Sequence, residues 1–238
     1  MHISLTRSSR LLVGTVLSTA LALALMVACA RPFVAAAPAP KPLTYVAIGA
    51  SDTVGVGAGS PESESWPAVL WRQLPPGSKL VNLGVSGTLL HEAIEQQAPV
   101  AVDMNPDLIT VWLSVNDYTG RVRLEQYESD LDRLLEQLRS QTGAVILVGN
   151  LPDLSMLPIA ARLGLRDVDR WNATIGGVTA RHQATLVDLH DTWREVAEHP
   201  EYISSDGFHP STSGYRRLAD IFYAAAAQQL SLLASASR

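Results

Sequence analysis

The chain has 238 residues, of which 47% are hydrophobic and 17% are charged, and its formal net charge is −5 at pH 7. This length suits one α/β domain with a substantial core, and the hydrophobic content excludes a disordered chain. No block of Lys or Arg forms the basic stripe that phosphate binding needs, so the composition argues against a nucleic acid partner.

The N-terminal residues 1–28 have the pattern of an export signal. Arg7 and Arg10 precede an uncharged, apolar run over residues 11–28, which is the order of charge and hydrophobicity in a signal peptide. Small residues before Cys29, at the end of that run, resemble a bacterial lipobox. The resemblance implies that Cys29 is lipidated and becomes the mature N-terminus, which predicts a cell-envelope lipoprotein.

Two alternatives to lipidation stay open. Met26 stands where a lipobox most usually has Leu, and an ordinary signal cleaved nearby would discard Cys29 and release a secreted protein. The apolar run over residues 11–28 is also at the lower limit of length for spanning a bilayer, so a retained membrane anchor is the second alternative. Residues 29–42 are rich in Pro and Ala and predict an extended tether. The folded domain is expected over residues 43–238.

From residue 43 onward, short apolar runs alternate with amphipathic stretches. Runs of this length and continuity are typical of strands buried on both faces of a parallel sheet. They cover residues 43–48, 79–83, 108–113, 144–148 and 184–188. Apolar residues at helical spacing predict helices around 124–138, around 165–178 and after Ser211. The alternation predicts an α/β fold with three layers (α/β/α) and a doubly wound, parallel, five-stranded sheet.

Polar motifs follow several of the expected strands. Ser51 comes after the first strand, residues 82–87 end the second and residues 114–117 end the third, while Asp206 and His209 lie beyond the fifth. Ligands of open parallel sheets bind beyond the carboxyl ends of the strands, so this topology brings the motifs to one rim. A nucleophilic serine needs a base, and the base needs a group that orients it. The sequence therefore predicts a serine hydrolase site.

Together the motifs resemble those of the SGNH or GDSL-type serine esterases, in the family's order and spacing, over most of residues 43–235. The matching blocks are Gly49-Ala50-Ser51 for Gly-Asp-Ser, Gly84 for the second-block glycine, Ser114-Val115-Asn116-Asp117 for Gly-x-Asn-Asp, and Asp206-Gly207-Phe208-His209 for Asp-x-x-His. The resemblance implies a flavodoxin-like sheet. It also implies hydrolysis of carboxylic esters through an acyl-enzyme, without a metal ion or cofactor.

The resemblance also implies a role for each matching residue. Ser51 is expected to be the nucleophile, His209 the base, and Asp206 the group that orients the imidazole. The backbone N–H groups of Ser51 and Gly84 and the side-chain amide of Asn116 are expected to form the oxyanion hole.

Two departures from the family pattern and one rival pair qualify this assignment. Ala50 replaces the usual aspartate and Ser114 the usual glycine. Neither position carries an expected catalytic role, so we expect the chemistry to survive, with a different backbone approach at Ser114. Asp188 and His190, at the end of the fifth strand, are an alternative source of the base. Asp117 is interpreted as a structural cap.

The substrate is less well defined by the sequence. Leu154, Met156 and Leu157 lie in an apolar loop after the fourth strand. They are candidates to line an acyl pocket, and packing beneath the loop is an equally open interpretation. The expected substrates are esters of small molecules, lipids or acylated glycans. An acyltransferase that uses the same site, and a non-catalytic binding module of the cell envelope, remain as alternatives.

Overall fold

The computed structural model describes residues 41–236. The predicted export signal, the lipidation candidate Cys29 and nearly all of the predicted tether lie outside the described residues. Among residues 41–236, no helix combines the length and the apolar character that crossing a bilayer requires.

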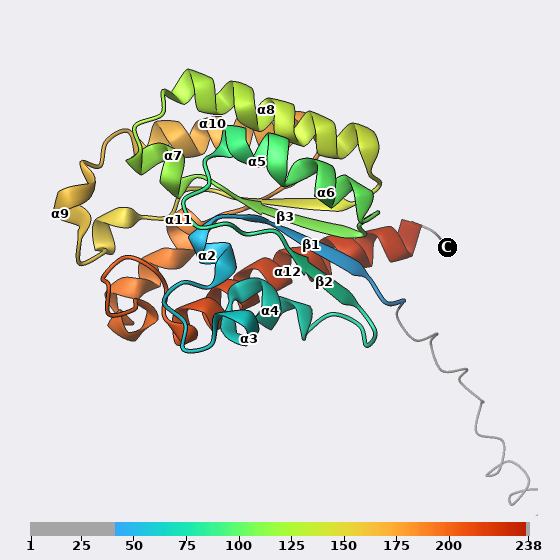
Figure 1. Cartoon of the computed structure of the whole chain (residues 1–238), viewed down its shortest axis with the longest axis horizontal. Helices are drawn as coiled ribbons and strands as arrows, with labels where there is room; N and C mark the ends of the chain where they lie inside the picture. Colours follow the sequence, from blue (N-terminus) through green and yellow to red (C-terminus); the bar gives the residue numbers. More distant parts are fainter. Residues whose placement is uncertain (1–40, 237–238) are drawn as a thin grey trace, which may run out of the picture. The chain divides into compact units, whose positions relative to one another are not determined.

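The domain is built on one parallel sheet with the strand order β2-β1-β3-β4-β5 (Figure 1). Its strands are β1 (Thr44–Gly49), β2 (Lys79–Asn82), β3 (Leu108–Trp112), β4 (Val145–Gly149) and β5 (Thr185–Val187). Every neighbouring pair is parallel. This is the flavodoxin-like order of a doubly wound sheet, so the predicted fold class is confirmed.

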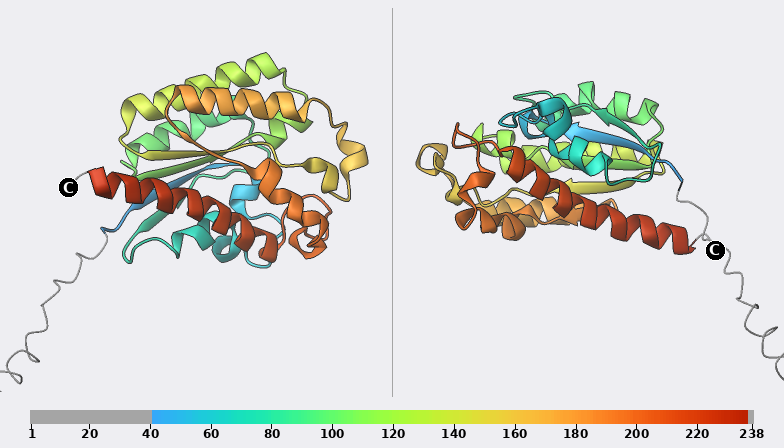
Figure 2. Two further views of the ribbon diagram at one scale, coloured as in Figure 1. Left: turned by 180° about the vertical axis from the view of Figure 1, so that it is seen from behind. Right: turned by 90° about the horizontal axis from the view of Figure 1, so that it is seen from below.

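Helices cover both faces of the sheet, as Figure 1 and the two views of Figure 2 show. One face carries α5 (Leu90–Gln96), α6 (Ala98–Asp103), α7 (Val115–Thr119), α8 (Leu124–Gln141) and α10 (Val168–Arg181). The other carries α2 (Ser51–Val54), α3 (Pro61–Glu64), α4 (Trp66–Trp71) and α12 (Thr212–Ala236). Shorter pieces fill the loops after β4 and β5, namely η1 (Leu154–Met156), α9 (Ala160–Leu163), α11 (Leu189–Thr192), η2 (Trp193–Ala197) and η3 (Pro200–Tyr202).

Each helical layer buries an apolar face against the sheet. On α8, Tyr127, Leu131 and Leu134 are at most 1% exposed, and each fully buried side chain of this kind contributes about 1.5–3 kcal/mol. On the other face, Trp66 of α4 stacks on Phe222 of α12 with ring centroids 4.2 Å apart. The two helical layers are thereby fixed to the sheet, which is a rigid base for the loops at its edge.

The register of the sheet decides where the loops of the carboxyl edge begin. Gly49, the last residue of β1, is paired with Trp112, the last residue of β3. Asn82, the last residue of β2, is paired with Ala47 of β1. The loops that follow these strands therefore start side by side, and they carry Ser51 and Asn116.

Candidate active site

Ser51 is the first residue of α2 and follows β1 through a sharp turn. Gly49 permits this turn, because a Cβ at that position would lie 1.9 Å from Thr53 Oγ1. The Thr53 and Val54 N–H groups both donate to the carbonyl oxygen of Ala50, at 3.0 Å. The Ser51 side chain makes no capping hydrogen bond to α2, so capping does not account for this serine. Ser51 is only 7% exposed.

His209 links Ser51 to Asp206. Its Nε2 lies 3.0 Å from Ser51 Oγ, and its Nδ1 lies 2.7 Å from Asp206 Oδ2. The structure thus brings Ser51 next to the Asp206 and His209 pair, although Ser51 and His209 are 158 positions apart in the chain. In this arrangement Nδ1–H donates to the carboxylate, which leaves Nε2 to accept the Ser51 proton.

Asp206 is held by hydrogen bonds from its own loop. Its Oδ1 accepts from Ser204 Oγ (2.8 Å) and from the backbone N–H groups of Phe208 (2.8 Å) and His209 (2.9 Å). Burial raises the pKa of this carboxyl, but the hydrogen bonds outweigh it. The bond from the His209 side chain is the strongest of them, and together they hold the pKa of Asp206 well below its usual range. Asp206 is therefore ionised while it orients the imidazole.

Asn116 lies in the first turn of α7 and is tied to the loop after β2. Its Nδ2 donates to the carbonyl oxygen of Thr88 at 3.0 Å, which leaves the second amide hydrogen for another acceptor. The neighbouring Asp117 accepts the N–H of Leu90, the first residue of α5, at 3.0 Å. Asp117 thus does the structural capping expected of it. Burial raises its pKa to about 7, against the opposing effects of the Leu90 N–H and His91.

The position of Gly84 requires a correction. Its N–H already donates to Asn82 Oδ1 at 3.0 Å, so it is not free to bind a substrate oxyanion. The residue is a glycine for a packing reason, because a Cβ there would lie 2.9 Å from Val54 N. A motif match identifies a glycine in this block but does not show which backbone N–H is free.

Gly87, further along the same loop, has the properties that Gly84 lacks. Its φ is +86° and a Cβ built on it would meet nothing within 4 Å, so its backbone faces open space. Among the described residues its N–H has no hydrogen-bond acceptor. The next residue, Thr88, is the one whose carbonyl holds the Asn116 amide. In the sequence, the consecutive residues Ser86 and Gly87 were the signal that could have identified Gly87.

The rival pair Asp188 and His190 is engaged elsewhere. Asp188 Oδ1 accepts the N–H groups of His190 (3.1 Å) and Asp191 (3.3 Å) and so caps α11. The His190 ring pairs with the exposed carboxylate of Asp191 at 3.2 Å. Ser51 Oγ has its hydrogen bond with His209 instead.

An apolar crevice with room for about 20 Å³ lies next to Asp52, the residue after Ser51, although Ser51 itself does not line it. It is lined by Asp52, Trp112, Val115, Pro152, Leu154, Leu157, Trp193, Phe208 and Pro210. Of the predicted acyl-pocket residues, Leu154 and Leu157 line this crevice, whereas Met156 is 37% exposed and does not. Met156 is the last residue of η1 and lies on the exposed side of this turn, and its apolar character alone does not show on which side it lies. Asp52 also lines the crevice, and the only signal for it in the sequence was an acid directly after Ser51.

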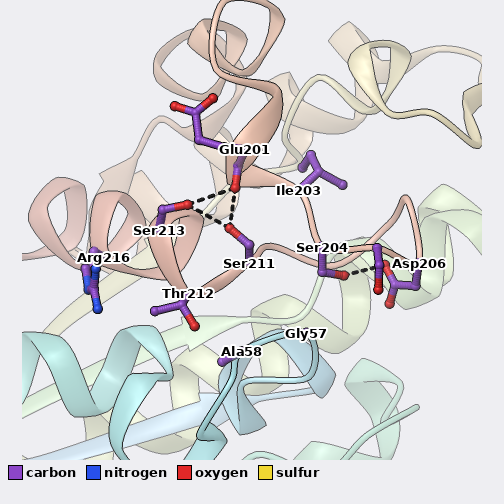
Figure 3. A pocket seen from close by; sticks show the side chains of 11 residues that line it. Gly57, Ala58, Glu201, Ile203, Ser204, Asp206, Ser211, Thr212, Ser213 and Arg216 are labelled. Carbon is purple, nitrogen blue, oxygen red and sulfur yellow. Dashed lines mark hydrogen bonds between the residues drawn. The ribbon is translucent and has the colours of Figure 1, made fainter.

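A larger polar groove of about 590 Å³ opens on the Asp206 side of the site (Figure 3). Ser211 and Ser213 lie in it and both donate to the backbone carbonyl of Glu201, at 2.5 and 2.8 Å. Ser51 is not among the residues that line the groove. The groove therefore reaches Asp206 but is not lined by Ser51.

Comparisons with known proteins point to one family. A model described as the GDSL-like Lipase/Acylhydrolase family matches residues 47–217. The thioesterase 1/protease 1/lysophospholipase L1 of Escherichia coli (strain K12) is 21% identical over 169 residues, which cover 71% of this chain and 77% of that protein. A GDSL-like esterase of Mycobacterium tuberculosis is 26% identical over 186 residues, 73% of this chain and 59% of that protein. The crystal structure of a lipase/acylhydrolase from Enterococcus faecalis has a TM-score of 0.63 at 16% identity, covering 76% of this chain and 93% of the other.

Proposed function

The chain belongs to the GDSL-like lipase/acylhydrolase family, and we propose that it is a serine esterase that cleaves carboxylic esters through an acyl-enzyme on Ser51. The observation that carries this proposal is the unbroken hydrogen-bonded line from Asp206 through His209 to Ser51, with distances of 2.7 and 3.0 Å. Such a line gives a serine hydroxyl both a base and an oriented imidazole, which a serine needs in order to attack at neutral pH.

In the proposed acylation step, His209 Nε2 takes the proton of Ser51 Oγ as the oxygen attacks the ester carbonyl. Asp206 keeps Nδ1 protonated and stabilises the imidazolium that forms. The same imidazolium then gives its proton to the departing alcohol. Water attacks the acyl-enzyme in the reverse sequence of proton transfers, so these steps need neither a metal ion nor a cofactor.

The tetrahedral intermediate carries a negative oxygen, and we assign its binding to three donors. These are the Ser51 N–H, the free amide hydrogen of Asn116, and the N–H of Gly87 in place of Gly84. The Gly84 N–H is used by Asn82 Oδ1, whereas the Gly87 N–H has no acceptor among residues 41–236. One such donor is typically worth roughly 10²–10³ in turnover.

We assign the acyl group to the small crevice next to Asp52, and its size favours a short acyl group. Its 20 Å³ exceeds only slightly the roughly 10–15 Å³ that one water molecule needs, and Leu154 and Leu157 close it as buried walls. We therefore expect p-nitrophenyl acetate to be hydrolysed with a higher kcat/KM than p-nitrophenyl octanoate. The reverse order would show that the acyl chain lies elsewhere.

Hydrolysis of p-nitrophenyl acetate by the wild type and by Ser51→Ala tests the proposed function. The variant should lose at least about 10³-fold in kcat, because the nucleophile is gone. Ser63→Ala is the matched control, since Ser63 is an exposed serine of α3, and it should keep the wild-type rate. An inert wild type would instead favour the binding module.

Export and lipidation are part of the proposal, and the leader sequence supports them. Arg7 and Arg10 before the apolar run, and Cys29 at its end, resemble a lipoprotein signal, with Met26 as the departure. In a bacterial host that lipidates exported proteins, the wild type should be found in the membrane fraction with Cys29 modified at its N-terminus. Cys29→Ala should be released to the soluble exported fraction. A wild type that is processed beyond Cys29 would support simple secretion.

A further inference from the structure

Asp52 is an acid in an otherwise apolar place. It follows Ser51 directly in α2, and its side chain is half-buried. Of the residues that line the apolar crevice, it alone carries a charge, and the crevice also includes Phe208 and Pro210, the two neighbours of His209. Asp52, next to Ser51, and the loop that carries His209 therefore line the same crevice.

No ion pair with a lysine or an arginine stabilises the carboxylate of Asp52 among residues 41–236. Burial raises the pKa of Asp52 to about 6, which means that the surroundings disfavour its ionised form. His209 is the group that most stabilises its charge. The other titratable groups that face Asp52 are Asp206, in the loop that carries His209, and Tyr215 of α12. A half-buried acid without a permanent cation costs stability, so a role in the site is the better explanation.

The position of the acid also differs from the family pattern stated above. The aspartate that normally precedes the nucleophile is Ala50 here, and Ala50 is only 6% exposed. The acid instead follows the nucleophile. Asp52 also lines a second narrow crevice with Ser114 and Asn116. Ser114 is the other departure from the family pattern, and its buried Oγ has no hydrogen-bond partner among residues 41–236. The two departures thus meet beside Asp52.

We propose that Asp52 is a positioning residue that acts through His209, and that its carboxylate stabilises the imidazolium formed when Ser51 gives up its proton. His209 is then attracted from two directions, by Asp206 at Nδ1 and by Asp52 across the crevice. No additional bond is made or broken. The proton still passes from Ser51 Oγ to His209 Nε2 and from there to the leaving alcohol. This inference rests on the proposed esterase function and concerns the electrostatics of the same site.

The competing explanation is structural. An acid in the first turn of a helix is stabilised by the helix dipole, by about 0.3–1 kcal/mol at an exposed site. That role would affect stability alone. Only an action through His209 also changes how activity depends on pH, so the pH profile separates the two.

The test is the pH profile of kcat/KM for p-nitrophenyl acetate in wild type, Asp52→Asn and Asp52→Glu, with rates normalised to active sites titrated by a fluorophosphonate. Asp52→Asn should lower the plateau about tenfold and move the midpoint of the acid limb about half a pH unit or more to lower pH, because the imidazolium loses an attractive neighbour. In wild type two coupled protonations should make that limb steeper than a single-proton curve. In Asp52→Asn the acid limb should have the slope of a single protonation. Asp52→Glu keeps the charge and should keep the wild-type midpoint.

Asp191→Asn is the control for the loss of one negative charge, because Asp191 is an exposed acid whose partner is His190. It should leave the profile unchanged. An Asp52→Asn variant with the wild-type midpoint overturns the inference, whether its plateau is normal or lowered together with its melting temperature. An inert wild type overturns the proposed function and the inference together, whereas an active wild type with an unchanged Asp52→Asn profile overturns the inference alone.

Discussion

The loop around Asp206 and the turn around Asp188 begin in the same way and end differently. In both, Oδ1 of the aspartate accepts the backbone N–H groups of the residues two and three positions further along the chain. In the first loop the residue three positions on is His209, and its Nδ1 meets the free Oδ2 at 2.7 Å. In the second it is Asp191.

The comparison teaches that one residue of spacing separates a catalytic pair from a helix cap. His190 lies two positions after Asp188, and its ring turns outward to pair with Asp191 rather than with Asp188. Each Oδ1 also accepts a third hydrogen bond, from Asn150 Nδ2 in Asp188 (2.9 Å) and from Ser204 Oγ in Asp206 (2.8 Å), so the position of the histidine rather than the number of donors separates the two. An aspartate can orient a histidine only when one of its oxygens is left free at the right position.

Replacing the two histidines should break this comparison most strongly. His209→Ala should lower kcat for p-nitrophenyl acetate by roughly 10⁴-fold or more, because Ser51 loses its base. His190→Ala should stay within about twofold of wild type. Both variants are measured with the same ester, and their melting temperatures show whether each is folded. Comparable losses in the two variants would mean that the site is assigned to the wrong pair.

Replacing the two aspartates should give a smaller but cleaner contrast. Asp206→Asn should lower kcat by roughly 10²–10⁴-fold, because the amide no longer fixes the imidazole tautomer. Asp188→Asn should leave kcat per active site unchanged and should change the unfolding free energy little, because Asn caps a helix about as well as Asp. Denaturant unfolding and active-site titration measure the two quantities separately. A large loss of kcat in Asp188→Asn would contradict the division of roles.

The fold could be predicted from the sequence because its strands are nearly continuous apolar runs. The run at 108–113 became β3 (Leu108–Trp112) and the run at 144–148 became β4 (Val145–Gly149). The long helices α8 and α12 also follow their apolar periodicity. The short helices α4, α5 and α6 had no such signal, since each is too brief to show a period and two of them begin with a proline near their first residue. Tertiary packing, rather than local pattern, makes them helical.

Only those parts of the site that depend on residue type and chain order could be predicted from the sequence. Ser51, Asp206 and His209 were identifiable because their chemistry is specific and the topology brings strand ends together. The error at Gly84 came from a feature without a sequence signature, the capture of its N–H by Asn82 Oδ1. The exposure of Met156 and the inward position of Asp52 likewise depend on how a single turn is oriented.

The acid range of stability should distinguish the two aspartates further, with the smallest expected effect. The pKa of folded Asp206 lies below its value in the unfolded chain. Its contribution to stability is therefore present above the unfolded pKa, near pH 4, and is lost as the pH falls further. Asp206→Asn should remove this part of the acid-induced loss, whereas Asp188→Asn retains Asp206 and should keep it. Thermal melting from neutral to acid pH provides the measurement. An unchanged acid dependence in Asp206→Asn would mean that its hydrogen bonds do not favour the ionised form.

The central claim is that Ser51, activated by His209, forms the covalent intermediate. Its most direct test is to treat the protein with a fluorophosphonate and locate the adduct by peptide mass spectrometry. We predict one adduct per chain, on the peptide that contains Ser51, with much slower labelling of His209→Ala and none on Ser51→Ala. A stoichiometric adduct on any other residue, or rapid labelling of His209→Ala, would contradict the account.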